Sequence, residues 1–200
     1  MAEENEELIE EIREKINIQI HDDGNIEVRE HEPILIKPKS QKERPSRHVN
    51  SLQVDLGLFD KRLQSEWMEG PICLIIIEVK GSKFISTHDA LIYSSKARKH
   101  KNLFPWLRYG MVWSSPPEKE NGIPRRFFMN NENLDFAYNF EENIDGNFKI
   151  FYENILKTQI EISRTLYDIF EKKIKVEYFS SYLKFGKKIK GKGEIVDEDD

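Results

Sequence analysis

The chain has a single cysteine, no long apolar run and no basic leader. Cys73 alone among 200 residues excludes a disulfide framework and a cysteine-built zinc site. No stretch approaches the roughly 20 apolar residues of a membrane span, so no membrane partner is expected. The start, MAEENEELIEE, is acidic, whereas an export signal needs a basic segment before an apolar one. These absences predict a cytoplasmic protein.

Charge of one sign is scarce in some parts of the chain and abundant in others. Residues 1–32 hold 3 basic and 12 acidic residues, residues 33–130 hold 17 basic and 9 acidic, and residues 131–200 hold 11 basic and 15 acidic. The basic middle block suits a polyanionic partner such as nucleic acid, although an unevenly charged, solvated surface would look the same. Length and an apolar content of 38% predict one domain, residues 1–200.

Apolar periodicity predicts an α/β fold, with a central mixed β-sheet flanked by helices and a long C-terminal helix. In the N-terminal unit, residues 3–32, a helix over 3–15 precedes a hairpin that alternates on both sides of DDGN. Strands are predicted over residues 51–59, 72–80 and 107–113, and a helix over residues 87–101, with Thr87 as its N-cap, lies between the last two.

The C-terminal part is less regular at first and then strongly helical. RRFFMNN and LDFAYNF predict two short strands or one broken strand. Residues 147–173 carry a broad apolar stripe at helical spacing, which indicates a core helix and leaves open the seam of a homodimer. Residues 186–200 are a charged tail that we expect to fray.

One constellation points to chemistry. An almost continuous apolar run ends in Glu78, Val79 and Lys80, and residues two apart on a strand share a face. Asp55 lies on the polar face of the preceding strand, beside Gly57, whose lack of a side chain leaves room for a bulky group. Two converging carboxylates suit Mg²⁺, and a neighbouring lysine can orient a metal-bound water and offset phosphate charge.

The pattern of an acid on one strand and Glu-x-Lys at the end of the next resembles the PD-(D/E)xK nuclease superfamily. Residues 51–114 would form its restriction-endonuclease-like core. The resemblance implies Mg²⁺-dependent hydrolysis of DNA phosphodiesters, with metal bound by Asp55, Glu78 and the carbonyl of Val79. Lys80 would activate water and join Asp55 and Glu78 as a catalytic residue. Valine precedes the acid here, where the family often has proline.

Several alternatives stay open. Asp60 is a second candidate for the metal-binding acid, and some relatives also use a glutamate of the first helix, for which this chain offers four residues: Glu7, Glu10, Glu11 and Glu14. Basic residues near the motif are candidates for contact with DNA phosphates or bases, namely Lys83, Lys96, Arg125 and Arg126.

These features predict a type II restriction endonuclease acting as a homodimer on double-stranded DNA, with a cognate methyltransferase as a further partner. A repair nuclease or junction resolvase of the same superfamily is one alternative. A DNA-binding protein without catalytic activity is another.

Overall fold

A five-stranded mixed sheet forms the centre of the protein. The structure is a computed structural model that describes residues 2–21, 24–32, 53–64, 70–81, 85–115, 123–141, 144–178, 187–188 and 195–196. The strands lie in sequence order: β1 (Ile26–Glu30), β2 (Leu56–Asp60), β3 (Ile72–Lys80), β4 (Arg108–Trp113) and β5 (Phe136–Asn139). Strand β2 is antiparallel to β1 and β3, whereas β4 is parallel to both β3 and β5.

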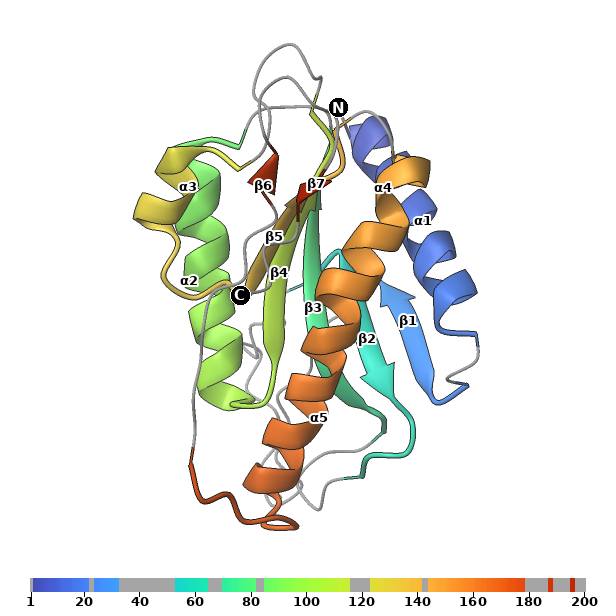
Figure 1. Cartoon of the computed structure of the whole chain (residues 1–200), viewed down its shortest axis with the longest axis vertical. Coiled ribbons are helices and arrows are strands. Elements are labelled where there is room, and N and C mark those ends of the chain that lie inside the picture. The colour runs from blue at the N-terminus through green and yellow to red at the C-terminus, as the bar shows by residue number, and fades with distance from the viewer. Residues whose placement is uncertain are drawn as a thin grey trace, which may run out of the picture.

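Helices cover the sheet on both sides. Figure 1 shows α2 (Thr87–Leu103) and α3 (Arg125–Asn130) on one side, and α4 (Ile144–Phe151) with α5 (Lys157–Phe170) on the other. Helix α1 (Ala2–Gln19) lies beside α4, to which an ion pair between Lys15 and Asp145 ties it. The predicted α/β class, with a mixed sheet between helices and a long helix near the C-terminus, is confirmed.

Strand β3 is the central strand of the sheet. Its first eight residues are buried, because β2 and β4 pair with its two edges and helices pack on both faces. A strand buried on both faces reads as a continuous apolar run, and this property made residues 72–80 predictable. Glu78 is the one charged side chain in the buried part of the strand, and Lys80 follows it at the end.

The predicted N-terminal hairpin is wrong in its first arm. Helix α1 continues to Gln19, and only the second arm exists as a strand, β1. The sequence is ambiguous because Ile16 and Ile20 fit both a period of two and the helical spacing of four residues. In the helix both are buried, whereas Ile18, which alternation would have placed beside them, is 70% exposed.

The long C-terminal helix contains one wide turn. Residues 152–156 form a π-helical turn, η1 (Tyr152–Leu156), between α4 and α5. The buried residues Phe151 and Leu156 are five positions apart, so one wide turn keeps the inward stripe facing the sheet on both sides of it. Helix α5 packs on β3 and β4, so this stripe belongs to the core.

Three smaller expectations need correction. RRFFMNN forms the helix α3, whose Phe127 is buried against Trp113, and only LDFAYNF contains a strand, β5. Ser86, one residue before Thr87, caps α2 through a capping box with Asp89. Strand β2 begins at Leu56, later than predicted, after an isolated bridge at Gln53.

The charged tail contains two short strands, β6 (Lys187–Lys188) and β7 (Ile195–Val196), which pair with each other in antiparallel fashion. The remainder of residues 186–200 lies outside the described residues. Within the described ranges, the helices are all too short or too polar to cross a membrane.

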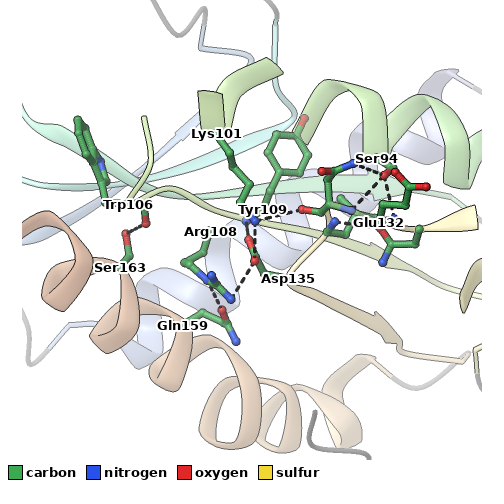
Figure 2. A network of polar contacts seen from close by, with 12 residues as sticks. Ser94, Lys101, Trp106, Arg108, Tyr109, Glu132, Asp135, Gln159 and Ser163 are labelled. Carbon is green, nitrogen blue, oxygen red and sulfur yellow. Dashed lines mark hydrogen bonds and ion pairs between the residues drawn. The ribbon is translucent and has the colours of Figure 1, made fainter. Parts of the chain in front are cut away.

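A polar network fixes the start of β4 (Figure 2). Asp135 accepts a hydrogen bond from the backbone N–H of Tyr109 at 2.7 Å, and it forms ion pairs with Lys101 at 2.7 Å and Arg108 at 2.8 Å. Arg108 also donates to Gln159 of α5 at 2.8 Å. The network joins α2, β4, α5 and the residue before β5, and it fixes the backbone of Tyr109, whose side chain enters the site described next.

Candidate active site

The predicted acids lie on neighbouring strands at one end of the sheet. The register of β2 and β3 pairs Leu56 with Ile77, and its extension by one residue places Asp55 opposite Glu78. Residues opposite each other in an antiparallel pair share a face of the sheet. Asp55 Oδ2 accepts a hydrogen bond from the backbone N–H of Val79 at 2.7 Å. The structure therefore brings Asp55 directly against the Glu-x-Lys segment.

Glu78 is almost inaccessible, with 1% of its surface exposed. Its Oε1 atom accepts a hydrogen bond from the hydroxyl of Tyr109, and Lys96 Nζ lies 3.2 Å from Oε1 and 3.4 Å from Oε2. Burial, and then the charge on Asp55, raise the pKa of Glu78 to about 7, against the opposing effects of Lys96 and Tyr109. Lys96 therefore favours the ionised form of a carboxylate whose burial favours the neutral form.

Lys80 is held by a residue of α2. Its ammonium group forms an ion pair with Asp89 in the first turn of the helix. Burial alone would raise the pKa of Asp89, but hydrogen bonds from Lys80 and Ser86 outweigh this effect and keep the pKa below its usual value. Lys80 is thus anchored at the same end of β3 as the two acids, with a negative partner that was not anticipated.

The carbonyl of Val79 meets the first turns of α1. Asn5 Nδ2 donates to this oxygen at 3.4 Å, and Asn5 Oδ1 accepts from the N–H of Gly81. A Cβ atom at Gly81 would lie 2.9 Å from Asn5 Oδ1, so glycine permits this close approach. The residue of the first helix that these contacts bring to the motif is therefore Asn5, and none of them involves the four candidate glutamates.

One face of α2 covers the site. Asp89, Tyr93, Lys96 and His100 follow one another at steps of four, three and four residues, so they line one side of the helix. Lys96 Nζ also lies 5.1 Å from the centre of the Tyr93 ring. Burial, and then the charges on Glu78, Asp55 and Asp89, raise the pKa of Tyr93.

The far end of β2 has a different character. Asp60 is fully buried and forms ion pairs with Arg62 at 3.0 Å and Arg164 at 2.8 Å. These contacts outweigh the effect of burial and lower the pKa of Asp60. The space beside Gly57 is taken by Phe59 of the same strand, because a Cβ atom on Gly57 would lie 2.6 Å from its ring. The ring of Phe59 therefore fills the space in which a bulky group was expected.

The residues proposed for DNA contact have different surroundings. Lys96 points into the site, on Glu78. Arg125 is exposed at the start of α3, and Arg126 donates to the carbonyl of Ile85 at 2.8 Å, which ties α3 to the segment before α2. Lys83 lies outside the described residues. DNA contact by these four residues stays a prediction.

The donor set suits a hard cation. Asp55, Glu78 and the Val79 carbonyl supply oxygen atoms, which Mg²⁺ prefers, and it commonly binds one or two protein carboxylates together with water and substrate phosphate. Among the residues that the structure describes, there is no cluster of three or more histidine, cysteine, aspartate or glutamate side chains able to hold a metal. A site here would therefore rest on two carboxylates and a backbone oxygen.

Comparisons with known proteins find no matching family model, and neither a curated protein nor a solved structure matches the chain. The structure by itself shows an α/β protein that has a pair of carboxylates and two lysines at the end of its central strand.

Sequence reasoning missed Tyr109, Asp89 and Asn5 as members of the site. Tyr109 reaches Glu78 only because β4 pairs with β3 in parallel, with Tyr109 opposite Ile76 on the same face. The helical spacing of Asp89, Tyr93 and Lys96 was the available signal, since it places three polar side chains on the face that also carries the buried Ala90 and Ala97.

Proposed function

We propose that this protein is a Mg²⁺-dependent endodeoxyribonuclease, in its simplest form a type II restriction endonuclease that acts as a homodimer on double-stranded DNA. The observation that carries the proposal is the placement of Asp55 against β3. Its side chain accepts from the N–H of Val79, across from Glu78 and next to the strand end that carries Lys80. The result is two carboxylates, a carbonyl and a lysine at one strand end.

The order of elements gives further support. After α1 and the additional strand β1, the chain forms a strand leading from the acid, a strand ending in Glu-x-Lys, a second helix and another strand, which are β2, β3, α2 and β4. This is the order that the resemblance to the PD-(D/E)xK superfamily implied. The basic block of residues 33–130, which contains the motif, suits a polyanionic substrate.

The residues at this strand end have different roles in the proposed hydrolysis. When bound, Mg²⁺ supplies Lewis acidity toward the phosphate and lowers the pKa of a coordinated water. Asp55, Glu78 and the Val79 carbonyl would hold it. Lys80, with Asp89 as its anchor, would orient the attacking water and offset negative charge that develops on the phosphate. Tyr109 fixes the Glu78 carboxylate by its hydrogen bond.

One observation favours a second candidate, a DNA-binding protein without turnover. Each of the two lysines at the site already forms an ion pair with a carboxylate: Lys96 with Glu78, and Lys80 with Asp89. A site whose charges are balanced internally can persist without metal. A repair nuclease or junction resolvase would use the same catalytic groups, and would differ in the DNA that it recognises.

Incubation of supercoiled plasmid with the full chain, with and without Mg²⁺, tests the proposal. Discrete fragments that appear only with Mg²⁺ indicate a restriction enzyme, and a smear indicates a nuclease without sequence preference. Cleavage of four-way junctions alone indicates a resolvase. An intact plasmid that shifts on a gel would remove the enzymatic proposal and leave the binding protein. Analytical ultracentrifugation tests the homodimer, and a methyltransferase that protects the same DNA sites would establish the restriction role.

Lys80→Ala gives the matched active-site test. We expect it to lower cleavage at least about 100-fold, because the group that orients water and offsets phosphate charge is lost. DNA binding measured by gel shift in Ca²⁺ should change little. Lys99→Ala, at an exposed position of α2, is the control and should cut normally. Undiminished cleavage by Lys80→Ala would contradict the assigned role.

A further inference from the structure

Lys96 holds an unusual position for a lysine of a helix surface. Its Nζ atom contacts both carboxylate oxygens of Glu78, at 3.2 and 3.4 Å, and lies 5.1 Å from the centre of the Tyr93 ring. Burial, and then the charge on Lys96, lower the pKa of His100, one turn further along the helix. The ammonium group therefore occupies the interior side of α2, directly on the acid assigned to the metal.

The electrostatics of the site explain this placement. Asp55 accepts a hydrogen bond from the N–H of Val79, the residue next to Glu78, and Glu78 is buried. An ionised carboxylate in such a place is costly without a cation nearby. Lys96 supplies that cation from the protein itself.

We propose that Lys96 is an internal counter-ion that occupies Glu78 in the metal-free protein and that a divalent cation must displace. This inference rests on the proposed function and adds to it a device that regulates metal loading. The side chain of Lys96 is 29% exposed, and its long stem lets the ammonium group move toward solvent without unfolding α2. Once released, it lies beside the site where a phosphate of DNA would approach.

Divalent-cation affinity is the first test, measured by calorimetry with Mn²⁺ on the full chain without DNA. At a pH high enough to keep Glu78 ionised in both proteins, and if the ion pair is formed in about 90% of molecules, Lys96→Met should bind Mn²⁺ about tenfold more tightly, since the competing cation is gone. Lys96→Arg keeps a cation that can bind Glu78 with two hydrogen bonds, so its affinity should stay at or below the wild-type value. Lys99→Met removes the same charge from an exposed position of α2 and should behave as wild type.

The second test needs no substitution at the site. Lys101 lies on the same helix as Lys96, and its side chain is similarly exposed. It forms a comparable ion pair with Asp135. In NMR spectra of the lysine ammonium groups, saturating Mg²⁺ should shift the signal of Lys96 strongly and leave that of Lys101 in place. A Lys96 signal that does not respond to Mg²⁺ would overturn the inference.

The outcomes separate this inference from the proposed function. If wild type binds Mn²⁺ and Lys96→Met binds no more tightly, the counter-ion role is wrong and the metal site stands. If neither protein binds Mn²⁺, both proposals fail. Binding by Lys96→Met alone would support the counter-ion role in its strongest form.

Discussion

The ammonium group of Lys80 pairs with the carboxylate of Asp89, the third residue of α2. Asp89 also accepts hydrogen bonds from the backbone N–H and the hydroxyl of Ser86, at 2.8 and 2.6 Å. One carboxylate therefore both caps the helix and positions the lysine proposed for catalysis. The start of α2 and the end of β3 are fixed to each other through this contact.

Asp89→Asn should separate the two roles of this carboxylate. The amide keeps the shape and much of the capping geometry but removes the charge that holds Lys80. We expect kcat for DNA cleavage to fall about 10- to 100-fold, because small misplacement of a catalytic group is costly, while KM changes little. Steady-state kinetics on a cleavable duplex measure both quantities.

Ser86→Ala is the matched control for the helix cap. It removes the hydroxyl that accepts from the N–H of Asp89 at 3.1 Å and leaves the partner of Lys80 in place. Loss of such a cap costs about 1 kcal/mol of unfolding free energy. A variant that loses stability in urea but keeps its kcat is expected. Equal loss of kcat in both variants would mean that Asp89 acts only through the cap.

Asp55→Asn and Asp60→Asn should fail in different ways. Asp55→Asn removes a charge that repels Glu78 and keeps an oxygen for the N–H of Val79. We expect it to fold normally, to bind Mn²⁺ weakly and to lose metal-dependent cleavage. Urea unfolding and calorimetry with Mn²⁺ measure these effects.

Asp60→Asn removes the buried negative charge that forms ion pairs with Arg62 and Arg164, so we expect a loss of about 3 kcal/mol in unfolding free energy. Assayed at a temperature where circular dichroism shows it folded, it should still cut DNA. Normal cleavage by Asp55→Asn, together with inactivity of folded Asp60→Asn, would move the metal-binding acid to the other end of β2.

The sequence predicted best what depends on local pattern. The strand over residues 72–80 was predictable because an apolar run of that length fits a strand buried on both faces, and its polar end then stands out. Asp55 was placed on the correct face because Leu56 and Leu58 alternate with it. The hairpin failed because Ile16 and Ile20 satisfy two periods at once, and only packing against the sheet decides between them.

What the sequence did not predict depends on how elements dock. Lys96 belongs to a run of basic residues, and spacing alone does not say whether it faces DNA or the interior. The docking of α2 on β3 and β4 places Lys96 on Glu78 and leaves Lys99, three residues later, exposed. Asn5 likewise reaches Gly81 only because α1 crosses the end of β3, a contact between residues 76 positions apart.

His100 should make the protein sensitive to mild acid. It is 1% exposed and stacks on Tyr109, with 5.5 Å between ring centres. Burial, and then the charge on Lys96, lower the pKa of His100 to about 4, whereas an unfolded histidine titrates near 6.5. Between these values the unfolded chain binds the proton and the folded one does not. Stability should therefore fall as pH drops from about 6.5 to about 4, by up to about 3 kcal/mol.

His100→Phe keeps an aromatic ring against Tyr109 and removes the titrating group. Urea unfolding of both proteins at several pH values between 4 and 7 gives the comparison. The carboxylates are common to both, so the difference in slope reports His100. Parallel curves would show that His100 does not contribute to the acid sensitivity.

Asp135→Asn tests whether the network at the start of β4 supports the site. The substitution leaves Lys101 and Arg108 without their carboxylate partner and weakens the acceptor for the N–H of Tyr109. Because Asp135 is largely buried, we expect a loss of about 3 kcal/mol in unfolding free energy. Asp168→Asn, which breaks a more exposed ion pair with Lys173, should cost less than about 1 kcal/mol. If Asp135→Asn costs as little unfolding free energy as Asp168→Asn, the network adds little. The pairing of β3 with β4 would then hold Tyr109 on Glu78 by itself.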